Sequence, residues 1–317
     1  MTSSGDPDSG LKIKSYARSI GFDLVGIAPA RPLTDHLDKL KDWISGGLNA
    51  DMNFFLRDIH KRADPSLLLD GVKSVIVTGI NYFPSEKQGG KGIPVISKYA
   101  YGKDYHNVVG DKLRNLLSFI ISIRPEARGK VCVDSSPILE KAWAKEAGLG
   151  WIGKNSILIN RESGSFIFLG EILLDIELSY DEPFSEDLCG ACNLCLNACP
   201  TLAINRNKTI DANKCISWLT VENKNDIPVI FNSRMNGRIF GCDICQDICP
   251  YNKDLIPHNN PDFRLSDSLR SLSISDYKSM SFEYFNKIFE NSPIKRLGYK
   301  RFTRNVNSVL SVSTMTD

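Results

Sequence analysis

Eight of the nine cysteines in this 317-residue sequence are crowded between Cys189 and Cys249. Disulfide-stabilised proteins are usually short secreted chains with cysteines spread throughout, so the crowding indicates a metal or cluster domain in a reducing compartment. The first run has the spacing C-x2-C-x2-C-x3-C-P, typical of bacterial ferredoxins that ligate [4Fe–4S] clusters. In such a run three thiolates bind one cluster and the fourth reaches the other. The run consists of Cys189, Cys192, Cys195, Cys199 and Pro200.

A second run, formed by Cys242, Cys245 and Cys249-Pro250, matches the last three positions of the same motif. Ile239 stands where its first cysteine would be, and we expect Cys215 to replace that ligand. Two zinc sites are the alternative, because C-x2-C pairs also bind zinc, although zinc rarely needs this third cysteine followed by Cys-Pro. The swapped pairing predicts one cluster on Cys189, Cys192, Cys195 and Cys249, and another on Cys199, Cys215, Cys242 and Cys245.

Two neighbouring clusters carry single electrons and do no organic chemistry unaided, so the rest of the chain must hold the site that they serve. The composition, 42% hydrophobic and 24% charged, is that of an ordinary globular protein with enough apolar residues for two domains. The formal net charge of +2 excludes a histone-like mode of nucleic-acid binding, which leaves only local basic patches for such contacts.

The ends and the hydropathy of the sequence indicate a cytoplasmic protein. No run of about 18 apolar residues occurs, so we expect no membrane span. Residues 1–10 are polar and lack the apolar stretch of a signal peptide, and we expect them to form a disordered tail.

Residues 11–180 alternate helix and strand patterns and are predicted to form an α/β (α+β) domain. Helical spacing of apolar residues predicts a helix over 106–121, and a β-branched run predicts a buried strand over 74–82. Ser136 and Pro137 suit the N-cap and first position of a helix over 138–147. Shorter strands are expected over 130–133, 156–160 and 165–169, the last two joined by a turn. The cysteine domain is expected over 181–260, followed by a helical C-terminal segment over 261–317.

Two features of the N-terminal domain lie at junctions between elements. Residues 148–153 match G-x-G-x-x-G, but a helix precedes and a strand follows them, the inverse of a dinucleotide-binding fingerprint. We therefore expect these glycines to form a tight turn beside a ligand. Asp134 lies where a strand ends and a helix begins, the usual rim of a ligand crevice, although a capping role is an equal alternative. Cys132 is expected in the core.

Basic side chains gather after residue 290 and within the cysteine domain. Those at 295–304 alternate with aromatic and apolar residues, a pattern that suits phosphates and unpaired bases as well as a solvated helix face. The basic residues of this group are Lys295, Arg296, Lys300, Arg301 and Arg304, with Arg206, Lys208, Lys224, Arg234 and Arg238 among the cysteines.

Five short motifs accompany the cysteine runs. They are RADPSLLL at 62–69, YAYGKDYH at 99–106, Asp134-Ser135-Ser136-Pro137-Ile138-Leu139-Glu140, AGLGWIGKN at 147–155 and SPIKR at 292–296. Their order resembles the epoxyqueuosine reductase family, cobalamin-dependent enzymes that complete the queuosine modification of tRNA. The resemblance extends from about residue 11 to residue 305.

The resemblance implies an N-terminal cobalamin domain of nitroreductase-like type, followed by a ferredoxin-like domain with two [4Fe–4S] clusters. It implies base-off cobalamin, which agrees with the sequence around His106: Asp104-Tyr105-His106 begins a D-x-H-x-x-G signature, but Val109 replaces its glycine. The catalytic acid of the family corresponds to Asp134. Cofactor contacts correspond to Arg62, Ser97, Asp134, Lys154, Asn155, Leu158 and Ser217, and tRNA contacts are expected from Lys224, Arg238, Lys295, Arg296, Lys300 and Arg301.

The implied reaction reduces epoxyqueuosine to queuosine at the wobble position of tRNAs with GUN anticodons, the final step of queuosine biosynthesis. Electrons from an external low-potential donor would pass through the clusters to cobalamin, and Asp134 would protonate the departing oxygen. The base would swing out of the anticodon loop to reach the cobalt. A monomer without membrane partners is expected.

Two departures and two rival functions accompany this interpretation. Asp134-Ser135-Ser136 stands where the family often has Asp-Thr-Gly, and many members continue into a helical-repeat extension that this sequence lacks. A reductive dehalogenase would share the cofactors but act on a small organohalide, usually behind a twin-arginine signal. A plain electron-transfer protein would leave the N-terminal domain unexplained.

Overall fold

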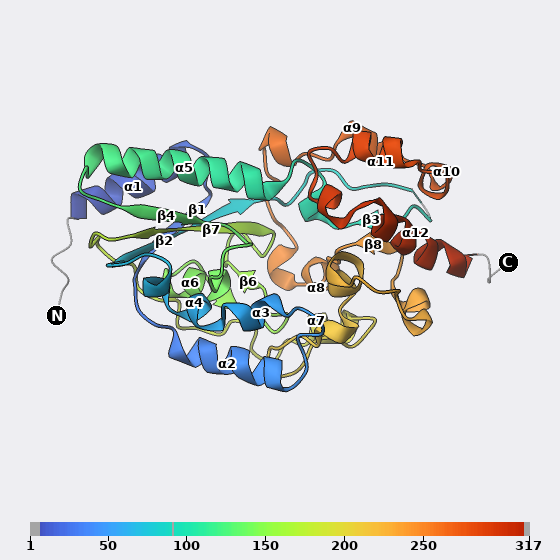
Figure 1. Ribbon diagram of the computed structural model, residues 1–317, viewed down its shortest axis with the longest axis horizontal. Helices are drawn as coiled ribbons and strands as arrows, with labels where there is room; N and C mark the ends of the chain where they lie inside the picture. Colours follow the sequence, from blue (N-terminus) through green and yellow to red (C-terminus); the bar gives the residue numbers. More distant parts are fainter. Residues whose placement is uncertain (1–6, 91, 314–317) are drawn as a thin grey trace.

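The structure is a computed structural model that describes residues 7–90 and 92–313. Its central sheet has four antiparallel strands in the order β1-β2-β7-β4 and lies toward one end of the molecule (Figure 1). The strands are β1 (Leu24–Pro29), β2 (Ser74–Asn81), β4 (Gly129–Cys132) and β7 (Ile167–Leu174). Antiparallel pairing makes this an α+β sheet, and the strands predicted at 74–82 and 130–133 are confirmed.

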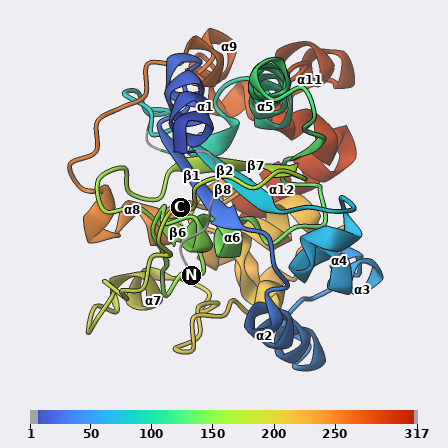
Figure 2. The ribbon, with the colours of Figure 1, turned by 90° about the vertical axis from the view of Figure 1, so that its left-hand side faces the viewer.

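Helices cover both faces of this sheet, so its inner strands are buried on two sides. On one face, α1 (Pro7–Ser19) and α5 (Tyr105–Ile123) bury apolar side chains against β2 and β7, which confirms the helix predicted at 106–121. On the other face lies α6 (Glu140–Glu146), whose Trp143 is fully buried among residues of β2 and β4. The helices α2 (Thr34–Ser45), α3 (Phe54–Arg57) and α4 (Ile59–Ala63) lie on this same side (Figures 1 and 2).

A second core joins the C-terminal helices to the cysteine segment. Strand β3 (Val95–Ile96) pairs in parallel with β8 (Arg238–Phe240), and Phe285 and Phe302 pack on them in one apolar cluster. Because this core draws residues from 93–101, 221–240 and 265–310, it crosses the domain boundaries expected at 180 and 260, which stay a prediction. Its helices are α9 (Asp267–Arg270), α10 (Ile274–Lys278), α11 (Phe282–Ile288) and α12 (Tyr299–Ser313).

Short elements surround the cysteines and the glycine motif. Helices α7 (Leu194–Ala198) and α8 (Ile244–Asp247) each lie within one cysteine run. Strands β5 (Trp151–Ile152) and β6 (Leu158–Ile159) form an antiparallel pair, with the glycine motif between α6 and the end of β5. The inverted order of helix and strand is therefore confirmed.

Three predictions of local structure are wrong in part. The helix predicted from residue 138 begins at Glu140 without a side-chain cap, because residues 134–139 form a loop in which the Leu139 amide donates to the Arg62 carbonyl at 3.1 Å. The strand β6 pairs with β5 and meets the segment before β7 only through a bridge between Asn160 and Gly164. Helix α1 already begins at Pro7, within the expected tail, while residues 1–6 lie outside the described residues. In the described ranges, no helix is long and apolar enough to cross a membrane.

Gly150 provides a test of the turn that leads into β5. Its φ is +153°, and a Cβ there would lie 2.1 Å from the Ile159 carbonyl oxygen, so Gly150→Ala must push β5 and β6 apart. We expect a loss of about 3 kcal/mol in the free energy of unfolding, measured by chemical denaturation. Gly89→Ala, where a Cβ meets nothing within 4 Å, is the control and should change stability little. Equal stability of the two variants would contradict the close approach.

Candidate functional site

The eight crowded cysteines surround two separate cavities. The first is small and opens near the surface, where Cys192 is exposed. The Trp151 indole N–H donates to the Cys189 sulfur at 3.4 Å, and Lys154 donates to the carbonyl oxygens of Gly190 and Cys192 at 2.8 and 2.7 Å. These contacts hold the first cysteine loop against β5. The cysteines of this cavity are Cys189, Cys192, Cys195 and Cys249.

The second cavity, of about 300 Å³, lies between the cysteine segment and the N-terminal domain. The Ala203 amide donates to the Cys199 sulfur at 3.3 Å. Among the described residues, no three His, Cys, Asp or Glu side chains could hold a single metal ion, so the sulfurs are spread around cavities instead of converging on a point. The cysteines here are Cys199, Cys215, Cys242 and Cys245, so both cavities have the membership of the swapped pairing, which itself stays a prediction.

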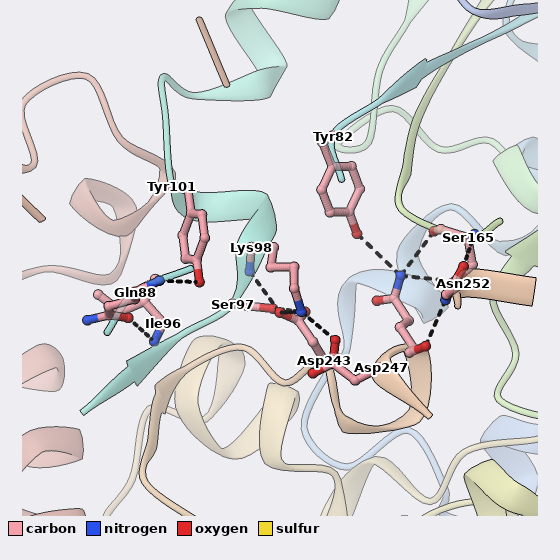
Figure 3. A network of polar contacts seen from close by, with 11 residues as sticks. Tyr82, Gln88, Ile96, Ser97, Lys98, Tyr101, Ser165, Asp243, Asp247 and Asn252 are labelled. Atoms are coloured by element: carbon pink, nitrogen blue, oxygen red, sulfur yellow. Dashed lines mark hydrogen bonds and ion pairs between the residues drawn. The ribbon is translucent and has the colours of Figure 1, made fainter. Parts of the chain in front are cut away.

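A buried ion pair ties the second cysteine run to the segment around β3 (Figure 3). Asp243, between two of the cavity's cysteines, accepts hydrogen bonds from the Ser97 hydroxyl and from the Lys98 amide at 2.8 Å. The Lys98 ammonium lies 3.5 Å from Asp243 and also binds Asp247. Burial opposes charge on Lys98, but the two carboxylates outweigh it and raise the pKa of Lys98 above its ordinary value. The lysine therefore stays charged inside the protein.

A neighbouring network fastens the same run to the central sheet (Figure 3). The side-chain amide of Gln246 donates to the backbone carbonyl of Ser165 at 3.0 Å. The side-chain amide of Asn252 donates to the Ser165 hydroxyl at 2.8 Å. The Ser165 amide returns a hydrogen bond to Asn252 at 2.8 Å, just before β7 begins. All three side chains are buried and satisfied, which fixes the cysteine run in position.

Asp134 lies on the loop that leaves β4. Its φ of +39° is uncommon for a residue with a side chain, and its amide donates to the Glu140 carboxylate at 2.6 Å. The Asp134 side chain accepts from His106 Nε2 at 2.6 Å and from the Tyr105 hydroxyl. The loop thus aims the carboxylate at the start of α5.

His106 is held between two carboxylates. Its Nδ1 lies 2.6 Å from Asp104, the N-cap of α5, and its Nε2 faces Asp134. Arg296 from the C-terminal segment reaches Asp104 at 3.0 Å. Burial opposes charge on His106, but its hydrogen bonds to Asp104 and Asp134 raise the pKa of His106 to about 9. Burial favours a neutral Asp134, but the bonds from His106 outweigh it and lower its pKa. At neutral pH the proton of this pair therefore resides on His106.

A larger cavity, of about 530 Å³, meets this acid pair and the second cysteine cavity. Tyr105, His106 and Asp134 line one side of it. Tyr99, Ile210, Cys215 and Ser217 line both this cavity and the second cysteine cavity, so the two are adjacent. The site therefore places one thiol, that of Cys215, and the His106–Asp134 pair around one hollow.

Of the seven residues that the resemblance assigned to a cofactor, Asp134 lines the larger cavity, and the other six fall into three groups. Ser97, Asn155 and Ser217 line the second cysteine cavity. Lys154 lies instead at the first cysteine cavity. Two others line none of these cavities: Arg62 is buried beside the Phe55 ring, 4.7 Å from its centre, and Leu158 is buried in the core under α6.

Three of the six basic side chains predicted to contact tRNA line the larger cavity, namely Lys224, Arg296 and Arg301. Arg301 donates to the carbonyl oxygens of Val221 and Leu297 at 3.1 and 2.8 Å, which gives it a structural role. Arg238 is half-buried and donates to the Asn236 carbonyl at 3.0 Å. The other four, which remain accessible to solvent, are Lys224, Lys295, Arg296 and Lys300.

Sequence reasoning missed the part played by His106. In the sequence, His106 belongs only to an incomplete cobalt-binding signature. No spacing rule connects it to Asp134, which lies 28 residues away. The available signal was local: an N-cap aspartate two residues before a histidine can bond its ring.

Two family models match the chain. One described as "Epoxyqueuosine reductase QueG, DUF1730" matches residues 62–135, and one described as "4Fe-4S double cluster binding domain" matches residues 188–252. The second match spans all eight crowded cysteines. The cysteine segment is therefore an iron–sulfur domain for two clusters, and the zinc alternative is set aside.

Several known proteins are similar over most of the chain. Epoxyqueuosine reductase of Cellulophaga algicola is 43% identical over 295 residues, which are 93% of this chain and 96% of that protein. A crystal structure of an epoxyqueuosine reductase with an epoxyqueuosine-modified tRNA-Tyr stem loop has a TM-score of 0.89 at 31% identity, covering 96% of this chain and 81% of the other. The enzyme from Bacillus subtilis, with an aspartate catalytic loop swung out of its active site, has a TM-score of 0.88 at 30% identity and the same coverages.

Removal of Cys215 tests the membership of the second cavity. If it is a cluster ligand, the anaerobically reconstituted protein should fall from about eight bound iron atoms per chain to about four in Cys215→Ala, with one of two cluster signals lost from the electron paramagnetic resonance spectrum. Cys132→Ala, a buried cysteine outside both cavities, is the control and should keep its iron. Full iron content in Cys215→Ala would refute the swapped pairing.

The pH dependence of stability tests the His106 pair. Because folded His106 holds its proton more tightly than the unfolded chain, its contribution to the free energy of unfolding is complete below pH 6.5 and is lost as the pH rises through about 9. In Asp104→Asn, which keeps a good N-cap, the ¹⁵N titration midpoint of His106 should move from about 9 toward 6.5. The exposed Asp111→Asn, on the same helix, should leave the midpoint unchanged. An unshifted midpoint in Asp104→Asn would contradict the pairing.

Proposed function

The chain belongs to the epoxyqueuosine reductase family, and we propose that it reduces epoxyqueuosine to queuosine at the wobble position of tRNAs with GUN anticodons. One observation carries this proposal: the cavity adjacent to the second cysteine cavity also meets Asp134 and His106, which hold a proton. An epoxide reductase needs electrons and protons at the same place, and a plain electron-transfer protein needs neither the acid pair nor the cavity.

The two adjacent cavities support cobalamin as the cofactor. Their walls combine aromatic surface, from Tyr99 and Trp218, with buried polar groups on Ser97 and Asn155 that can bind amide side chains of a corrin. Both ring nitrogens of His106 are engaged by carboxylates, which favours a base-off cofactor without a histidine ligand. When bound, cobalamin would supply a low-potential cobalt able to reduce an epoxide carbon.

Asp134 and His106 act as the acid of this reaction. His106 carries the proton at neutral pH, and Asp134, at 2.6 Å, lies on the cavity wall and can pass it to the departing oxygen. Arg296 and Asp104 hold the imidazole in the orientation that faces Asp134. The loop position of Asp134, with its positive φ, suits a residue that must move with the substrate.

The accessible basic residues around the cavity bind the tRNA substrate in this proposal. Lys224 and Arg296 line it, and the relative solved with a modified tRNA stem loop supports the same substrate class here. The wobble base would leave the anticodon loop to reach the cavity, since loop bases unstack at low cost. In this proposal the electrons come from an external low-potential donor. The protein acts as a monomer in the cytoplasm.

An anaerobic assay tests this function directly. Reconstituted protein, cobalamin, a low-potential reductant and tRNA carrying epoxyqueuosine should yield a nucleoside lighter by one oxygen, measured by mass spectrometry after digestion, and only when cobalamin is present. Asp134→Asn should lower the rate by at least about a hundredfold, because the acid step is lost.

Two controls make the assay decisive. Cluster and cobalamin absorbance in Asp134→Asn should equal that of the wild type, and the exposed Asp254→Asn should retain its rate. No mass change despite bound cobalamin and intact clusters would refute the proposed reaction and favour a small-molecule reductase.

A further inference from the structure

The proposed reaction requires a second proton that the His106–Asp134 pair does not hold. Reduction of an epoxide to an alkene breaks two C–O bonds and releases the oxygen as water, which consumes two electrons and two protons. The electrons come from the external donor through the clusters. His106, charged at neutral pH, holds one proton. A group close to Asp134 can supply the other.

Glu140 is an acid that contacts the backbone of Asp134. It is the first residue of α6, and its carboxyl group turns back over the loop to accept the Asp134 amide at 2.6 Å. This hydrogen bond uses only Oε1, so a proton on Oε2 leaves the contact intact. Burial, followed by the negative charge of Asp134, raises the pKa of Glu140 to about 7. An acid with that pKa gives up and regains a proton readily at working pH.

A second buried carboxyl group lies behind Glu140. Glu171, on β7, is fully buried, and neither of its oxygens has a hydrogen-bond partner among the described residues. Burial, followed by the charge of Glu140, raises the pKa of Glu171 well above its ordinary value. Two close carboxyl groups do not both ionise readily, so Glu171 stays neutral and Glu140 is the member of the pair that titrates.

The titratable groups that surround Glu140 come from several elements. They are Asp134 from the loop, Lys141 from its own helix, His106 from α5 and Glu171 from β7. The Lys141 ammonium donates a hydrogen bond to the Ser156 carbonyl at 2.7 Å and forms no ion pair with Glu140 among the described residues. Glu140 therefore has no ion-pair partner in the described chain that would strip its proton.

We propose that Glu140 supplies the second proton of epoxide reduction through Asp134. The first proton moves from His106 through Asp134 to the epoxide oxygen and gives a hydroxyl group. The second moves from Glu140 to the restored Asp134 carboxylate and on to that hydroxyl group, which leaves as water. His106 is left neutral and regains a proton from solvent through the open cavity that it lines, and Glu140, left as a carboxylate, regains its proton through Asp134. Glu140 is thus a proton-relay and positioning residue, and the inference rests on the proposed function.

Glu140→Gln separates the relay from the positioning role, because glutamine keeps an oxygen to accept the Asp134 amide but carries no proton to transfer. With pre-reduced enzyme, the wild-type single-turnover rate should fall as the pH rises through about 7. In Glu140→Gln the rate at pH 6.5 should be at least about tenfold lower than in the wild type. The decrease in rate near pH 7, the alkaline limb of the pH profile, should also disappear. Glu140→Asp, which restores an acid, should recover part of the rate together with the limb.

Glu146→Gln, on the same helix and paired with Arg31 at the surface, is the matched control and should keep both the rate and the limb. Cluster content and thermal melting of each variant exclude a folding defect as the cause. A Glu140→Gln rate within twofold of wild type, with the same limb, would overturn the proposal.

An infrared titration gives a readout that does not depend on activity. The wild-type protein should show a protonated-carboxyl band that titrates near pH 7 and that is missing from Glu140→Gln. If wild type makes no queuosine, the proposed function fails, while this band still decides whether Glu140 holds a proton. If wild type is active and the band is absent, only the relay fails.

Discussion

The buried ion pair between Lys98 and Asp243 determines where the clusters lie relative to the rest of the site. Asp243 stands between Cys242 and Cys245, so whatever holds this carboxylate also holds the second cysteine cavity. A charged lysine in the protein interior is tolerable only with its partners in place, and removing one would leave an uncompensated buried charge. The pair therefore specifies one arrangement of the cysteine segment against the segment around β3.

This arrangement brings the second cysteine cavity and the His106–Asp134 pair to a single hollow. On one side lies Cys215, which also lines the second cysteine cavity, and on the other lie His106 and Asp134. The C-terminal segment takes part, because Arg296 reaches Asp104 and so fixes the histidine from outside the N-terminal domain. The second apolar core, which unites these segments, is what allows a contact between residues 192 positions apart in the chain.

Sequence patterns predicted the features that depend on local spacing. The cysteine runs indicated two sets of four, with Cys215 placed among them, and the same sets surround the two cavities. Apolar periodicity predicted α5, and a run of β-branched residues predicted β2, for the same reason. The start of α6 was not predictable, because the Asp134 loop is held by Glu140 and by a carbonyl of Arg62, far away in sequence. The meeting of His106 with Asp134 depends on how α5 crosses the end of β4, which no local pattern encodes.

The interleaving of the two cysteine runs has a consequence for biogenesis. Each cavity takes cysteines from both runs, so neither run alone can complete a ligand set. On the predicted pairing, iron loading waits until residues 189–249 have been brought together, and a chain that ends before Cys245 retains neither set whole. Iron binding would therefore require that both cysteine runs have been synthesised and have folded together.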